Sequence, residues 1–162
     1  MPVNGWTLLF HDALASQLDN LVAAYERARK ADPKNFASNP NVKLLAAIAR
    51  LLLEIIPADP GRPEYRQGNT LGTEYRHWFR VKFMGRFRLF FRYDSRSKLI
   101  VYAWVNDENT LRQSGSKRDP YEVFKRMLDS GNPASDWATL VKSTRTLPDR
   151  IAAPLTDPRK RK

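Results

Sequence analysis

Residues 76–112 read RHWFRVKFMGRFRLFFRYDSRSKLIVYAWVNDENTLR, and this stretch decides the fold. Successive side chains of a β-strand point to opposite faces of the sheet. In 79–83 and 87–93 the odd-numbered residues are apolar, whereas the even-numbered positions carry most of the basic side chains. The third run, 99–105, is apolar throughout. The pattern predicts three neighbouring strands that bury one face against a core.

The alternation also predicts how the first two strands pair, because residues opposite each other in an antiparallel pair share a face. Pairing Phe83 with Phe87 leaves a three-residue loop and sets Lys82 against Arg88. A two-residue loop would set Lys82 against Phe87 and mix the two faces. We therefore predict the three-residue loop.

For the second pair, the polar residues 94–98 predict a loop, and pairing Tyr93 with Leu99 sets Arg88 against Trp104. We expect the following residues to be buried against two N-terminal helices: Phe79, Val81, Phe83, Phe87, Leu89, Phe91 and Val101. The opposite face, which we predict to be open, would carry Trp78, Arg80, Lys82, Arg88, Phe90, Arg92, Tyr102, Trp104 and Asn106.

The remaining sequence predicts helices and loops around this sheet. Pro and Gly mark 57–73 as a connector, and Pro, Asp and basic residues dominate after Pro148. We predict one domain, 1–147, followed by a basic, disordered tail, 148–162. The expected elements are a strand over 3–10, a helix from an Asp12 cap to about residue 30, a helix from Pro40 that stops before Pro57, a helix that starts at Asp119-Pro120, and a last helix capped by Ser135.

The positive charge of the 162-residue chain is concentrated. Its net charge is +11, and residues 76–118 hold eleven basic and three acidic side chains. Such a patch is the electrostatic footprint of a protein that binds polyanions. The chain has no cysteine, shows no signal-peptide pattern and contains no apolar run near the ~18 residues of a membrane span. We expect a cytoplasmic protein.

A basic face interleaved with aromatic residues suits RNA, because phosphates bind Arg and Lys while unstacked bases bind aromatic rings. Alternatively, the basic residues solvate an exposed face and the aromatic residues lie under a C-terminal helix. The RNA contacts that we predict are Arg76, Trp78, Arg86, Arg92, Tyr102, Trp104, Asn106 and Arg112.

The sequence resembles the RelE-like toxin ribonucleases, and within them the YhaV-type toxins of type II toxin–antitoxin operons. The resemblance spans about 3–140. It is carried by VNGW at 3–6, RVKF at 80–83, GRFRLFFRY at 85–93, WVNDENTLR at 104–112 and DPYEVF at 119–124, with ML at 127–128 and DW at 136–137. It implies an α+β fold with a β-α-α-β-β-β core, in which a curved antiparallel sheet carries two N-terminal helices on one face and one or two C-terminal helices. It also implies a growth-inhibiting endoribonuclease that cleaves mRNA during translation and is neutralised by an antitoxin.

The resemblance places catalytic basic residues at Arg80, Lys82 and Arg88. Cleavage by the 2′-OH of RNA requires a proton acceptor, a proton donor and charge stabilisation at phosphorus. Lys82 is a candidate base because Arg80 and Arg88 disfavour its ammonium form, and Glu108 is the competing base. A fourth basic residue of RelE-like enzymes is missing or displaced to Arg112.

A mechanism with two histidines would require His11 and His77 in one site. No Asp, Glu and His residues have metal-ligand spacing, so we predict a metal-independent reaction without a cofactor. Expected partners are mRNA, the ribosome and an antitoxin, with operator DNA reached only through the antitoxin complex. Two alternative functions remain open. The protein is a non-catalytic nucleic-acid binder or co-repressor, or it is an interaction domain whose basic face binds an acidic protein.

Overall fold

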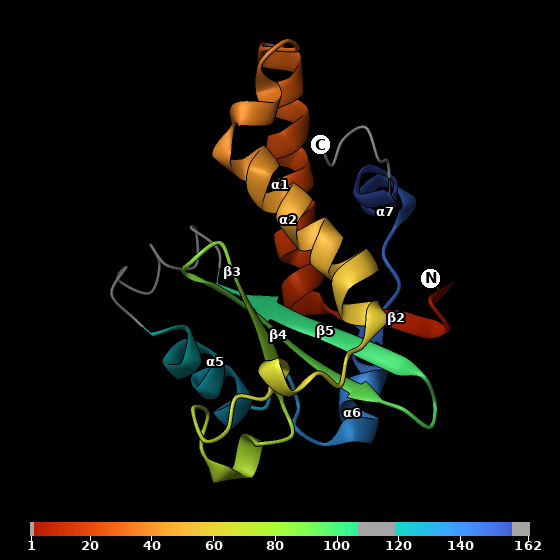
Figure 1. Cartoon of the computed structure of the whole chain (residues 1–162), viewed down its shortest axis with the longest axis vertical. Coiled ribbons are helices and arrows are strands. Elements are labelled where there is room, and N and C mark those ends of the chain that lie inside the picture. Colours follow the sequence, from red (N-terminus) through yellow and green to blue (C-terminus); the bar gives the residue numbers. More distant parts are fainter. Residues whose placement is uncertain (1, 107–118, 157–162) are drawn as a thin grey trace.

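The computed structural model describes residues 2–106 and 119–156, and it shows a mixed α+β fold around one sheet (Figure 1). The strands of this sheet are Pro2–Val3 (β1), Trp6–His11 (β2), Phe79–Phe83 (β3), Phe87–Asp94 (β4), Leu99–Val105 (β5) and Thr144–Arg145 (β6). Their order is β1-β2-β5-β4-β3, and β6 pairs with β2. The α-helices of the described part are Asp12–Ala31 (α1), Pro40–Arg50 (α2), Ile56–Ala58 (α3), Pro120–Asp129 (α5), Trp137–Lys142 (α6) and Asp149–Thr156 (α7).

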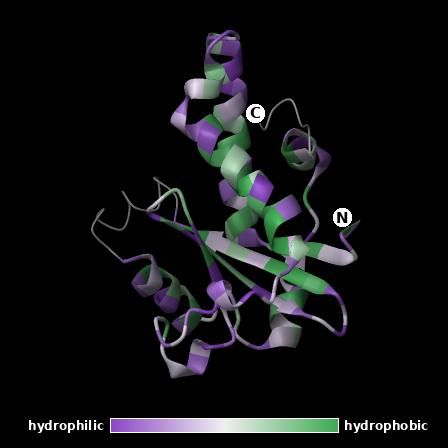
Figure 2. Cartoon of the chain, in the orientation of Figure 1, coloured by the Kyte–Doolittle hydropathy of each residue, from purple (hydrophilic) through white to green (hydrophobic). Residues whose placement is uncertain are grey.

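The sheet is mixed rather than antiparallel. Strand β2 runs parallel to β5, with Leu8 opposite Ile100, whereas the other strand pairs are antiparallel. The prediction of an antiparallel sheet is therefore wrong for this pair. Parallel neighbours need a long crossover connection, which here contains α1, α2 and the β3–β4 hairpin. Figure 2 shows hydrophobic residues along β2 and β5, as expected for strands covered on both faces.

Helices α1 and α2 stand side by side on one face of the sheet (Figure 1). The cap of α1 is His11 rather than the predicted Asp12. Pro40 is the first residue of α2, as predicted, and Asn39 caps this helix. Beyond α2 the chain remains helical through a π-helical segment, Leu51–Ile55, and α3, so the predicted stop before Pro57 is wrong.

The core between these helices and the sheet contains most of the residues predicted for it. Buried there are Leu14, Leu18, Ile48 and Leu52 from the helical segments, and Val81, Phe87, Leu89 and Phe91 from the sheet. Phe79 and Phe83 are partly buried against the same core. The periodicity of β3 and β4 therefore predicts their buried face correctly.

The opposite face of the sheet is covered, contrary to prediction. Helices α5 and α6 lie across it (Figure 1). The ring of Phe124 in α5 stacks on Phe90 with centroids 4.3 Å apart, and on Trp104 at 5.7 Å. A second core results, formed by Leu71, Tyr75, Trp78, Phe90, Val101, Ala103, Trp104, Phe124, Leu128 and Leu140.

The predicted pairing of β4 with β5 is also wrong. Tyr93 lies opposite Ile100 instead of Leu99, and a second register shift occurs between Phe90 and Phe91. Phe90 pairs with Trp104 and Phe91 with Tyr102, which leaves Ala103 as the extra residue of a bulge.

The bulge moves two side chains to the faces opposite those predicted. Val101 lies in the second core, under α5 and α6. Tyr102 lies in the first core, where its hydroxyl donates a hydrogen bond of 2.7 Å to the Leu52 carbonyl. A one-residue shift exchanges the faces of a strand, and the uniformly apolar run 99–105 gives no sequence signal for it.

Helix α7 lies in the segment predicted to be a disordered tail. Ile151 and Leu155, four residues apart on one side of the helix, are buried in the first core. The prediction of disorder from residue 148 is therefore wrong for Asp149–Thr156, and residues 157–162 lie outside the described part. No helix among the described residues is long and apolar enough to cross a membrane.

The cap of α1 makes stability depend on pH. The Nδ1 atom of buried His11 accepts a hydrogen bond of 3.1 Å from the Ala13 N–H. Burial lowers the pKa of His11 below its ordinary 6.5, although Asp12 and a hydrogen bond with Asn132 act in the opposite direction. The folded state thus favours the neutral ring. Its contribution to stability is complete above pH 6.5 and is lost as the pH falls through the folded-state pKa.

We expect His11→Asn to remove this dependence, because Asn caps helices without titrating in this range. The free energy of unfolding can be measured in urea between about pH 8 and about pH 5. As the pH falls, the wild type should lose up to about 1.4 kcal/mol of this free energy per pH unit relative to His11→Asn. Parallel stability curves for the two proteins would contradict this role of His11.

Candidate functional site

The β3–β4 hairpin brings the predicted catalytic cations together. Phe83 pairs with Phe87 and Lys82 with Arg88, so the predicted register of this pair is confirmed. Lys82 is exposed, whereas Arg80 and Arg88 are half-buried. Lys82 lies opposite Arg88, and Arg80 lies two residues from Lys82 in the same strand. All three side chains therefore point to the face of the sheet opposite α1 and α2.

Arg80 is held in place by two hydrogen bonds. Its Nε atom donates to the Tyr121 hydroxyl at 2.9 Å, and its Nη1 atom donates to the Glu64 carbonyl at 2.7 Å. Tyr121 lies in the first turn of α5, where its ring packs edge-on against Phe90. No pattern in the sequence points to Tyr121, which lies 41 positions from Arg80.

Arg88 is anchored at its backbone and partly at its side chain. Its Nη1 atom donates to the carbonyls of Gly85 and Phe87 at 3.2 and 2.9 Å. Its Nε atom is buried and finds no hydrogen-bond acceptor among the residues described. A buried N–H without an acceptor costs free energy, and an anionic oxygen would satisfy it only after a side-chain movement that exposes it.

Asn106 fixes the position of Arg88 rather than facing a ligand. Its side-chain oxygen accepts from the Arg88 N–H at 2.6 Å, and its side-chain nitrogen donates to the Arg86 carbonyl at 3.0 Å. Only 1% of Asn106 is exposed. The predicted position of Arg88 opposite Trp104 is wrong, because the bulge at Ala103 places Trp104 opposite Phe90.

The aromatic residues predicted to stack on RNA bases are buried. Trp78 and Trp104 pack against Phe124 of α5, and Tyr102 lies in the core on the other face. The prediction that they stack on bases is therefore wrong. For Trp78 and Trp104 the alternative holds, in which aromatic residues lie under a C-terminal helix.

The Arg92 side chain is surrounded by other residues of the protein. Its guanidinium lies 5.5 Å from the ring centroid of Trp78 and 5.0 Å from that of Trp137, and Nη1 donates to the Ser135 carbonyl at 2.7 Å. Burial lowers the pKa of Arg92 to about 10. Arg92 thus fastens the segment before α6 to the sheet, where we had predicted an RNA contact.

The two histidines have separate partners. His77 Nε2 lies 2.9 Å from the Ser135 hydroxyl, and burial lowers the pKa of His77. His11 is buried in the cap of α1. Of the other predicted site residues, Arg76 and Arg86 are exposed, and the Arg86 guanidinium lies 5.2 Å from the ring centroid of Phe87. Glu108 and Arg112 lie outside the described residues.

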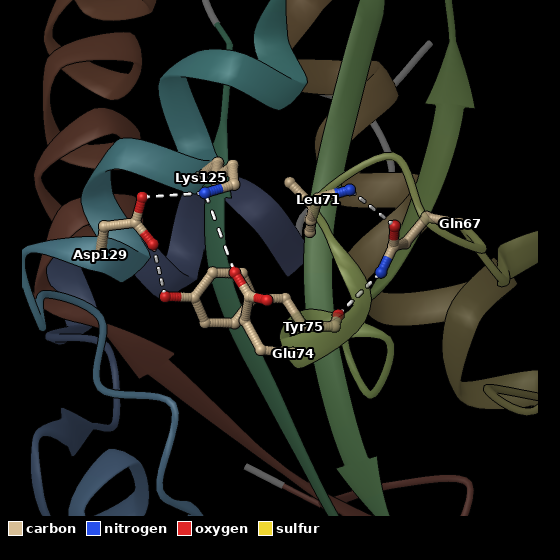
Figure 3. Close-up of polar contacts among 6 residues, drawn as sticks. All are labelled: Gln67, Leu71, Glu74, Tyr75, Lys125 and Asp129. Carbon is tan, nitrogen blue, oxygen red and sulfur yellow. Dashed lines mark hydrogen bonds and ion pairs between the residues drawn. The ribbon is translucent and has the colours of Figure 1, made fainter.

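A polar network anchors α5, and with it Tyr121 (Figure 3). The Tyr75 hydroxyl donates to Asp129 at 2.7 Å, and this hydrogen bond raises the pKa of Tyr75 to about 12. Lys125 Nζ lies 3.1 Å from Asp129 and 3.8 Å from Glu74. Gln67 holds the connector by donating to the Tyr75 carbonyl at 2.7 Å. Within 2–106 and 119–156, no three His, Cys, Asp or Glu side chains form a group that could hold a metal ion.

The buried position of Asn106 leads to a test. Asn106→Ala removes two hydrogen bonds and leaves the Arg88 N–H without its acceptor, so we expect the free energy of unfolding to fall by about 1–3 kcal/mol. Urea unfolding measures this loss, and exposed Asn20 in α1, replaced by Ala, is the control. Reduced RNA affinity with unchanged unfolding energy would instead support the predicted RNA contact.

Comparisons with known proteins identify the family. A family model described as a toxin with endonuclease activity, of a toxin–antitoxin system, matches residues 8–145. The ribonuclease toxin YhaV of Escherichia coli strain K12 is 44% identical over 144 residues, which cover 88% of this chain and 94% of that protein. Toxin YhaV of Escherichia coli O157:H7 has the same identity and coverage. No solved structure matches the chain at a significant level. The chain therefore belongs to the YhaV family of toxins.

Proposed function

We propose that this toxin is an endoribonuclease that cleaves mRNA at the cationic face of the β3–β4 hairpin. The observation that supports it most strongly is the pairing of Lys82 with Arg88 beside Arg80, in a stretch, 76–92, that contains no acidic residue. Like charges set opposite one another destabilise a strand pair unless an anion binds. The family's endonuclease activity and the ribonuclease name of the relative support RNA as that anion.

In this proposal Arg88 stabilises the negative charge that develops at phosphorus. A guanidinium presents a planar fork of N–H groups that can hold two oxygens of one phosphate. The support from geometry is that Nη1 is fixed to the hairpin while Nε has no acceptor among the described residues. Arg80 adds positive charge beside the same phosphate.

Lys82 accepts the proton of the attacking 2′-OH in this proposal, with Glu108 as the competing acceptor. Lys82 is exposed and lies opposite Arg88, so substrate can reach it. Tyr121 is a candidate donor to the leaving oxygen. Its hydroxyl accepts a hydrogen bond from Arg80 and keeps its own proton available for donation.

The remaining partners and conditions are also proposals. The reaction needs no metal or cofactor, since the chemistry is carried by the side chains of the chain itself. A cognate antitoxin blocks the site, the ribosome presents the mRNA in the cytoplasm, and operator DNA is contacted only through the antitoxin complex. The family match does not favour the alternative of a non-catalytic nucleic-acid binder.

Replacing the two paired cations tests these roles. Arg88→Ala should lower the single-turnover cleavage rate about 10²–10³-fold, comparable to the loss of one preorganised donor in other enzymes. RNA affinity should fall much less, because one phosphate contact is a small share of binding. Lys82→Ala should also cleave slowly, and Lys82→Arg should not restore the rate, because arginine remains protonated.

The assay measures cleavage and equilibrium binding on the same RNA in EDTA, with and without ribosomes. Arg27→Ala, which removes an exposed cation from α1, is the matched control and should leave both quantities unchanged. A wild-type rate in Arg88→Ala, or equal losses of rate and affinity, would remove Arg88 from the catalytic role. No cleavage by the wild type under either condition would favour the non-catalytic binder.

A further inference from the structure

A groove of about 260 Å³ lies between the start of α2 and the tip of the β3–β4 hairpin. Its apolar lining residues come from both elements, and two cations also line it. Among the lining residues are Pro40, Leu44, Met84 and Phe87, with Lys43 and Arg86. The groove thus adjoins the hairpin that carries Lys82 and Arg88, but it opens between that hairpin and the helical layer.

Met84 is unfavourable for the fold in two respects. It is 51% exposed, and among the residues described it is the only large hydrophobic side chain with such exposure. Its φ angle is +49°, in the left-handed region, which costs a residue with a side chain about 1–2 kcal/mol. A strained backbone that presents an apolar side chain to solvent points to a role outside folding.

The chain near the groove carries mainly positive charge. Residues 33–53, which include α2, contain no Asp or Glu, and the acidic residue of the β3–β4 hairpin, Asp94, lies at the end of β4 far from the groove. Lys43 and Arg86 contribute cations to the groove itself. A ligand that complements this surface is acidic and offers an apolar side chain to the space between Met84 and Pro40.

The lining favours a protein ligand over RNA. Phe87 is the aromatic residue of the groove, but only 4% of it is exposed and the Arg86 guanidinium lies over its ring. A nucleobase would therefore find no free ring to stack on. Leu44 is buried like Phe87, but the exposed side chains of Met84 and Pro40 suit the apolar face of a helix or an extended peptide.

We propose that this groove binds an acidic, amphipathic segment of the cognate antitoxin, with an apolar anchor against Met84 and Pro40 and carboxylates facing Lys43 and Arg86. The inference rests on the proposed function in that it presumes an antitoxin partner. A segment bound here would contact the hairpin that carries Lys82 and Arg88. The antitoxin would then neutralise the toxin by binding in the groove and by blocking access of RNA to these two cations.

Two variants separate binding from folding. Met84→Asn removes the apolar anchor and should not destabilise the toxin, because Asn adopts the left-handed conformation readily. Lys43→Glu reverses a charge near the start of α2, where an acidic residue interacts favourably with the helix dipole. Lys142→Glu on α6, which packs on the other face of the sheet, is the matched charge control.

The probe is the purified antitoxin encoded beside the toxin gene, titrated calorimetrically into each toxin. We expect Met84→Asn and Lys43→Glu each to weaken binding about tenfold or more, and Lys142→Glu to bind like the wild type. RNA cleavage by the free toxin should be unchanged in Met84→Asn. Thermal melting of each free variant confirms that it is folded.

Wild-type antitoxin affinity in both groove variants would overturn the proposal, as would a wild-type toxin that binds no antitoxin. Reduced RNA cleavage in Met84→Asn with unchanged antitoxin affinity would assign the groove to RNA instead. If the wild type cleaves no RNA but the groove variants still lose antitoxin affinity, the proposed function fails and the groove assignment stands.

Discussion

The pairing of β3 with β4 is the constraint on which the rest of the structure depends. Phe83 opposite Phe87 sets the register, and this register directs Val81 and Leu89 into the core under α1 and α2. The same register places Lys82 opposite Arg88 on the other face. Burial of the apolar face stabilises a strand pair whose cationic face is repulsive, so the fold holds two like charges opposite each other.

Helix α5 turns this strand pair into a defined site. Phe124 covers the centre of the second face by stacking on Phe90, while the start of the helix brings Tyr121 to Arg80. The aromatic side chains Trp78, Phe90 and Trp104 are thereby part of a second core instead of an open stacking surface. What remains accessible is the cationic end of the hairpin, which favours recognition of a phosphate over recognition of bases by stacking.

The sequence predicted the parts of this arrangement that leave a periodic signal. Alternation of apolar and basic residues was sufficient for the β3–β4 register, but the uniformly apolar run 99–105 could not reveal the bulge at Ala103. That bulge moved Tyr102 into the core and placed Asn106 beside Arg88. Helix α7 was missed because its buried side chains stand in a segment rich in Pro and charge. Tyr121 could not be found, since its contact with Arg80 exists only in three dimensions.

We propose that Lys82 and Arg88, the paired cations of the hairpin, hold the phosphate to be cleaved. The most direct test is lysine acylation followed by mass spectrometry, with and without an RNA carrying 2′-deoxyribose at the cleavage site. Such an RNA lacks the attacking hydroxyl and therefore binds without being cut. We expect bound RNA to protect Lys82 from acylation and to leave the exposed Lys142 on α6 reactive. Equal reactivity of Lys82 in free and RNA-bound toxin would contradict it.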